Sequence, residues 1–274
     1  MKCLLWIMLS FSFNSIVVAD EKVELNDFSQ NIEESSDVTL PDSATASLVR
    51  PNQLSLFYTA ASNRFEQSGS GQTYKSDPGT GSGLFSVFER EMQNGDFLEI
   101  KGWYHLANFS EPSEIGGKDV GVERSLLSLL YSWQTEGEKF KWHYQAGLSS
   151  FSQDPGNFSS GNKLSSHYLS IGPSVGGGFK WNVNKTWTLK LNAVASLPIF
   201  FKEYGSKSGY HDLSYHYLLS NLVFVRLNRF LSFSFGVIGE SETHRFNGEG
   251  DRNVEDAELS YFSIAIPIGL VYDF

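Results

Sequence analysis

Residues 258–274 read ELSYFSIAIPIGLVYDF, and in this stretch bulky apolar residues alternate with smaller or more polar ones. The bulky set is Phe262, Ile264, Ile266, Ile268, Leu270, Tyr272 and Phe274. The set between them is Tyr261, Ser263, Ala265, Pro267, Gly269, Val271 and Asp273. Successive side chains of a strand point to opposite faces, so this alternation predicts a strand with one strongly apolar face.

The same rhythm runs back through the chain as far as residue 53. We predict ten strands, each of roughly ten or more residues, which is long enough to cross a bilayer when tilted. Strands of soluble sandwiches are usually nearer five or six residues. The predicted strands are 53–62, 82–92, 96–108, 122–134, 138–151, 167–182, 186–198, 212–227, 229–244 and 258–274.

Short and long connections alternate between these strands. The short ones are 93–95, 135–137, 183–185 and Asn228, and the long polar ones are 63–81, 109–121, 152–166, 199–211 and 245–257. Trp133, Trp142, Trp181 and Trp187 all lie within a few residues of a short connection, where an interfacial aromatic belt is expected, whereas Trp103 lies further along its strand.

These features together resemble the Gram-negative outer-membrane β-barrel superfamily, in which strands end in short periplasmic turns and long external loops. The resemblance implies an all-β, transmembrane, antiparallel up-and-down barrel, with ten strands favoured over eight or twelve and both termini in the periplasm. Tyr272 and Phe274 look like the C-terminal signal that the barrel-assembly machinery reads. The implied partners are that machinery, outer-membrane lipid and lipopolysaccharide, with an external ligand as a further partner of the loops.

The N-terminal region divides into two parts. Residues 1–19 combine Lys2, an apolar run and the small pair Val17 and Ala19, which predicts a cleaved signal peptide. Residues 20–52 are acidic and poor in apolar residues, which predicts a disordered periplasmic segment before the barrel at 53–274.

Composition excludes several classes of function. The formal net charge is −10 and no basic cluster occurs, which argues against a nucleic-acid partner. The single cysteine, Cys3, lies in the predicted signal peptide, so a disulfide scaffold and a cysteine metal site are excluded. We expect no cofactor.

The polar faces of the predicted strands give the candidate lumen residues. They are Glu99, Lys101, His105, Arg124, Lys141, His143, Gln145, Lys180, Lys190 and Asn192. One reading is that they fill a closed lumen with ion pairs and hydrogen bonds, leaving the protein a structural or surface-binding barrel with five external loops. The alternative is a narrow, weakly anion-preferring pore, because five cations face the single carboxylate of Glu99 in this set.

Enzymatic barrels leave motifs that can be tested. Barrel lipases and lipid A deacylases place a serine two residues after a histidine, so that both share one strand face. Here the residues at that offset are Ala107, Gln145, Leu169, Leu213, Leu218 and Phe246. His211 and Asp212 only distantly resemble the acidic and histidine residues of omptin proteases. We therefore predict no catalytic site, and a barrel hydrolase ranks third.

Overall fold

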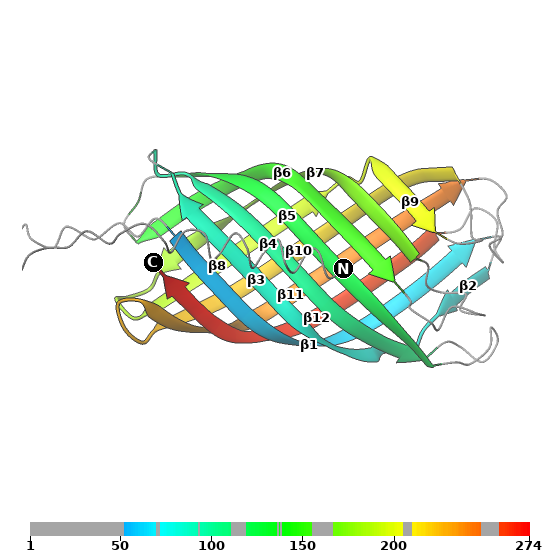
Figure 1. The fold of residues 1–274 in the computed structure, drawn as a ribbon, viewed down its shortest axis with the longest axis horizontal. Coiled ribbons are helices and arrows are strands. Elements are labelled where there is room, and N and C mark those ends of the chain that lie inside the picture. Colours follow the sequence, from blue (N-terminus) through cyan, green and yellow to red (C-terminus); the bar gives the residue numbers. More distant parts are fainter. Residues whose placement is uncertain are drawn as a thin grey trace, which may run out of the picture. The chain divides into compact units, whose positions relative to one another are not determined.

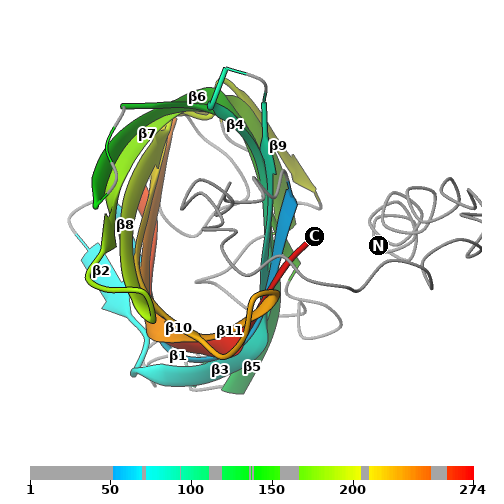
Figure 2. The same cartoon turned by 90° about the vertical axis from the view of Figure 1, so that its left-hand side faces the viewer.

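In the computed structural model, the described residues from Asn52 onward form a closed antiparallel β-barrel (Figures 1 and 2). The structure describes residues 52–69, 72–92, 94–110, 119–135, 137, 139–154, 167–204, 210–247 and 258–274. The predicted signal peptide and nearly all of the predicted acidic segment lie outside these ranges. Among the described residues, no helix is long and apolar enough to cross a membrane.

Ten main strands make the wall, as the sequence pattern predicts. They are β1 (Asn52–Gly69), β3 (Gly79–Glu91), β4 (Phe97–Ser110), β5 (Asp119–Gln134), β6 (Phe140–Asp154), β7 (His167–Asn182), β8 (Trp187–Ser196), β10 (Tyr210–Arg226), β11 (Leu231–Asn247) and β12 (Glu258–Asp273). Each pairs with its neighbours along the chain, and β12 pairs with β1 over 16 residue pairs, which closes the ring.

Two short strands continue main strands across an irregularity. β2 (Gln72–Lys75) extends the line of β3 along β1, and β9 (Phe200–Tyr204) extends the line of β8 along β7. The register moves by one residue at each junction, from Ser174↔Ser196 to Ile171↔Phe200 in the second case. An extra residue on one strand is a β-bulge, which bends the strand and changes the face that later side chains occupy.

The barrel has two different ends. We call the end with the short turns, where Asn52 and Phe274 also lie, the turn end, and the opposite end, marked by β2 and β9 in Figure 1, the loop end. Phe274 N donates to Asn52 O at 3.0 Å, so the last residue is paired to the first strand. Most residues of the long connections lie outside the described ranges.

Burial follows the predicted alternation. In β12 the residues from Phe262 to Phe274 at even numbers are all exposed, whereas Tyr261, Ser263 and Ala265 are buried in the lumen. The predicted belt tryptophans Trp133, Trp142, Trp181 and Trp187 are exposed on the outer surface near the turn end, and Trp103 is an inward residue only 2% exposed.

Candidate functional site: two polar clusters in the lumen

All ten predicted lumen residues lie on the inward face of the wall. Three of them, Lys141, Lys180 and Lys190, are partly exposed. The other seven are buried. The structure divides them into two groups. Arg124 and His105 belong to a loop-side cluster, and the others gather nearer the turn end in a turn-side cluster.

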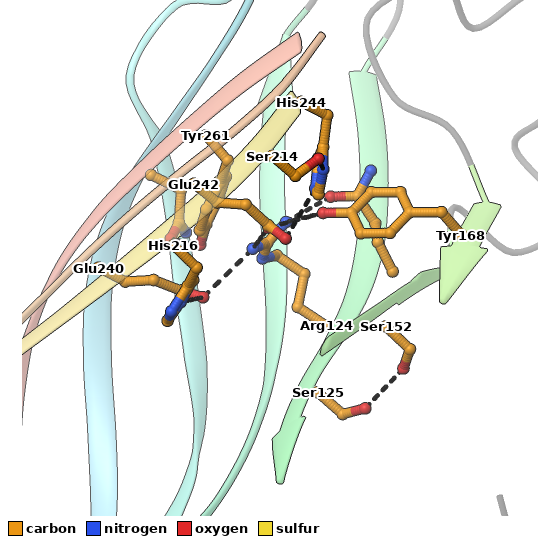
Figure 3. A network of polar contacts seen from close by, with 12 residues as sticks. Arg124, Ser125, Ser152, Tyr168, Ser214, His216, Glu240, Glu242, His244 and Tyr261 are labelled. Carbon is orange, nitrogen blue, oxygen red and sulfur yellow. Dashed lines mark hydrogen bonds and ion pairs between the residues drawn. The ribbon is translucent and has the colours of Figure 1, made fainter. Parts of the chain in front are cut away.

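Arg124 is the centre of the loop-side cluster (Figure 3). Its Nη1 donates to Gln153 Oε1 at 2.5 Å and to Tyr168 OH at 3.2 Å. Its Nη2 donates to Glu240 Oε1 at 3.2 Å and to Glu242 Oε2 at 2.5 Å. Arg124 is on β5 and both glutamates are on β11, which are not neighbours in the wall, so these bonds cross the lumen.

Both glutamates also hold a histidine. His216 Nε2 lies 3.0 Å from Glu240 Oε1, and His244 Nε2 lies 2.8 Å from Glu242 Oε1. The other ring nitrogen of His244, Nδ1, lies 2.5 Å from Ser214 Oγ. Ser214, His244 and Glu242 therefore form a hydrogen-bonded chain, and all three are at most 2% exposed.

An aromatic branch joins this cluster to the neighbouring strands. The guanidinium of Arg124 stacks on the ring of Tyr261, with Cζ 3.5 Å from the ring centroid. Tyr261 OH donates to Asn63 Oδ1 at 2.7 Å and lies 2.6 Å from His105 Nε2. The cluster thus ties β1, β4, β5, β6, β7, β10, β11 and β12 together from inside.

The turn-side cluster is built on crossed ion pairs. Lys190 on β8 pairs with Glu89 on β3 and, at 3.3 Å, with Glu99 on β4. Lys101 Nζ lies 2.7 Å from Glu99 Oε1, and Gln145 Nε2 donates to the same oxygen at 2.8 Å. Charges inside a membrane-spanning wall are tolerated when they are paired in this way.

An apolar layer packs in the lumen, and on β4 its Trp103 lies between Lys101 of the turn-side cluster and His105 of the loop-side cluster. It consists mainly of Phe57, Phe85, Val87, Trp103, Leu126, Phe151, Leu218, Leu222 and Ile238, which are at most 6% exposed. Beside it, a chain of hydroxyl hydrogen bonds at 2.7–2.8 Å links Ser128, Ser149, Ser174 and Ser196 across four strands. A space beside this serine chain has no room for a water molecule, and its lining includes Lys101, Ser128, Ser149 and His216. A second space, beside Lys190 and Asn192, has a volume of about 20 Å³.

The predicted charge imbalance of the lumen is wrong. Glu89, Glu240 and Glu242 also face inward, and with Glu99 they pair with Lys101, Arg124 and Lys190. The alternation of Glu240, Glu242 and His244 with Gly239, Ser241 and Thr243 is visible in the sequence and could have identified them. Their partners could not be read from it, because those partners lie across the lumen.

The structure also brings together a serine and a histidine that the motif of barrel lipases does not cover. That motif places both residues on one strand, whereas Ser214 and His244 are directly opposite each other on β10 and β11. A bulge between His211 and Ser214 produces this register. The side chains of His211 and Asp212 lie outside the described part. No group of three or more His, Cys, Asp or Glu residues within the described ranges is arranged to hold a metal ion.

Comparison with known proteins finds no matching family model and no matching curated protein. Similar solved structures include the outer membrane protease OmpT from Escherichia coli, with 10% identity, coverage of 82% of this chain and 97% of that chain, and a TM-score of 0.48. An outer membrane channel from Pseudomonas putida F1 has 12% identity, coverage of 82% and 97%, and a TM-score of 0.46. The outer membrane protein OprG from Pseudomonas aeruginosa has 12% identity, the same coverage and a TM-score of 0.38.

These similarities are too low to assign an activity, and the class follows from the barrel itself. A closed wall leaves no unpaired strand edge, its outer face is apolar with tryptophans near one end, and its charged residues pair inside. The protein is a closed ten-stranded antiparallel β-barrel with the apolar outer face and the polar lumen of a membrane-spanning barrel.

Proposed function

We propose that the protein is a structural or surface-binding barrel whose lumen does not conduct ions. The observation that supports this is the apolar layer, in which Phe57 packs on Phe85 and Phe85 on Trp103 with ring centroids 5.7 and 6.1 Å apart. An ion that passed this layer would lose its hydration. The polar groups beside it include the serine hydroxyls of four strands that are already hydrogen-bonded to one another, so the loss would be costly. The proposal assigns recognition of an external ligand or lipopolysaccharide to the long loops.

Conductance in planar bilayers tests the proposal. Protein inserted into the bilayer, with insertion verified by flotation of matched vesicles, is expected to give no steady current. Steady current would overturn the proposal. A change of anion preference in the double variant Lys141→Glu, Lys190→Glu would then support the alternative, a narrow pore lined by these lysines.

A second candidate, a hydrolase, is favoured by one arrangement only. The chain of Ser214, His244 and Glu242 has the nucleophile, base and orienting carboxylate of a catalytic triad within hydrogen-bond distance. Glu242 is also held by Arg124 and Tyr168, which ties it to the wall. A fluorophosphonate probe tests the idea: labelling that is lost in Ser214→Ala and kept in Ser220→Ala would support it, and no labelling of the wild type would exclude it.

A further inference from the structure

We propose that the outer surface of β10 and its two neighbours in the wall, β8 and β11, is an interface through which two copies of this barrel pair side by side in the membrane. Two features distinguish this surface from an ordinary lipid-facing wall. One is an exposed side-chain amide in the middle of the apolar band, and the other is a ridge along β10 with hollows on both sides. We call this surface the β10 face, and it consists of Tyr217, Leu219 and Asn221 on β10, Ala193 and Ala195 on β8, and Gly239 and Ser241 on β11.

Asn221 is on the outer surface, away from both ends of the membrane-spanning wall. Its neighbours along β10, Ser220 and Leu222, are buried in the lumen, whereas Asn221 itself is exposed. Four residues toward the turn end, β10 pairs with Trp187 of the aromatic belt, and four residues toward the loop end it carries the exposed Tyr217. Four residues of a strand span about 13 Å, so the amide lies well inside the apolar band.

The amide of Asn221 has no hydrogen-bond partner among the described residues. The residues directly opposite it are Leu191 and Val237, whose side chains are apolar. Two other polar side chains of the outer surface are satisfied within the wall, because Ser125 Oγ and Ser152 Oγ are hydrogen-bonded to each other at 2.6 Å. Hydrocarbon offers an amide no hydrogen bonds, so leaving Asn221 against lipid is costly.

The chemistry of this amide fits a second copy of the same chain. A primary amide has two donor hydrogens and an acceptor oxygen, so two such amides can form a reciprocal pair of hydrogen bonds. Copies that enter a membrane by one route have the same orientation, and two of them can pair about a two-fold axis along the membrane normal. Such an axis brings the same surface of each copy together, so Asn221 meets its own equivalent.

The shape of the β10 face is also self-complementary. Leu219 is 50% exposed and lies directly opposite two small residues, Ala193 on β8 and Gly239 on β11. Tyr217, one outward step nearer the loop end, also has a small residue on each side. A Cβ added at Gly239 would meet no atom of the described residues within 4 Å, so the hollow there is open. Small residues let membrane-embedded elements approach closely, and the two-fold axis can place the ridge of each copy in a hollow of the other.

Sedimentation equilibrium of the refolded full-length protein in a density-matched zwitterionic detergent tests the interface. The wild type is expected to show a reversible monomer–dimer equilibrium that shifts with the ratio of protein to detergent. Gly239→Leu fills the hollow without a clash inside the barrel and should weaken dimerisation by about tenfold or more. Asn221→Leu removes the amide and leaves an apolar surface, and it should weaken dimerisation about tenfold, the effect of losing hydrogen bonds between side chains in the membrane.

Asn108→Leu is the matched control for Asn221→Leu. Asn108 is also an exposed asparagine of the outer surface, but it is on β4, on the opposite side of the ring from β10, so this variant is expected to dimerise as the wild type does. A wild type that stays monomeric at every ratio of protein to detergent would overturn the proposal. Equal effects of Asn221→Leu and Asn108→Leu, or unchanged dimerisation of Gly239→Leu, would also overturn it. Heat-modifiable migration in gels verifies folding of each variant, and the result does not depend on whether the lumen conducts.

Discussion

Arg124→Met should be among the most destabilising single changes in this barrel. Arg124 is 4% exposed, and four hydrogen bonds and a ring contact hold its guanidinium. Without it, Glu240 and Glu242 remain inside the lumen with two histidines and the hydroxyl of Tyr168 as their partners, and no permanent cation. Removing one partner of a buried ion pair costs about 3–5 kcal/mol, and we expect this loss in the free energy of unfolding.

Arg245→Met provides the comparison. Arg245 Nε also donates to a glutamate, Glu258, at 2.7 Å and toward the same end of the barrel, but the two side chains are 52% and 33% exposed. Such a pair is worth about 0–1 kcal/mol because water screens it. Adding Glu240→Gln and Glu242→Gln to Arg124→Met should recover about 2 kcal/mol or more, since no buried unpaired charge remains.

Urea titrations of the protein in lipid vesicles, followed by tryptophan fluorescence, measure these free energies. The reasoning is refuted if Arg124→Met costs no more than Arg245→Met. It is also refuted if the triple variant is less stable than Arg124→Met alone.

Two further perturbations separate the lipid face from the lumen face of the wall. Leu148→Arg places a charge on the outer surface near the middle of β6, where Leu148 is 57% exposed, and should lower the free energy of unfolding in vesicles by about 2–4 kcal/mol. Val183→Arg, in a turn, should lower it little. Equal losses would contradict the membrane position of the barrel. Gly178→Val should lower the free energy of unfolding by about 1–3 kcal/mol, because a Cβ at this position would lie 1.9 Å from Leu191 O. An unchanged unfolding midpoint would show that the backbone around Gly178 can shift to make room for the side chain.

The sequence determines the wall of this barrel almost completely. Alternation is local, so the faces of the strand 258–274 and the tryptophans near the short turns could be assigned without a structure, and all ten predicted strands are found. Strand ends were less accurate at the loop end, where β1 extends to Gly69 rather than residue 62. The bulges at β2 and β9 were not predicted, because they depend on the register between two strands rather than on the pattern of one.

The lumen could be predicted only in part, for a physical reason. Which side chains face inward is again a local property, and all ten predicted lumen residues do so. Which of them meet depends on the closure of the ring, which brings β5 to β11 and β8 to β3. Glu240 and Glu242 lie on β11, far from Arg124 in the sequence, so the excess of positive charge that favours a pore disappears only when the ring closes and pairs them with Arg124.

Both clusters tie the wall together from inside, and both retain buried polar atoms without a hydrogen-bond partner among the described residues. At the loop side, Arg124 has carboxylates on one side and a ring on the other, yet Arg124 Nε, His216 Nδ1 and Glu240 Oε2 have no such partner. At the turn side, Glu99 pairs with Lys101 and Lys190, and Gln145 Oε1 has none. Unsatisfied buried polar groups are costly to fold. The stability of the lumen therefore depends on the ion pairs that cross it, which is why Arg124→Met and its control Arg245→Met are the most informative pair of variants.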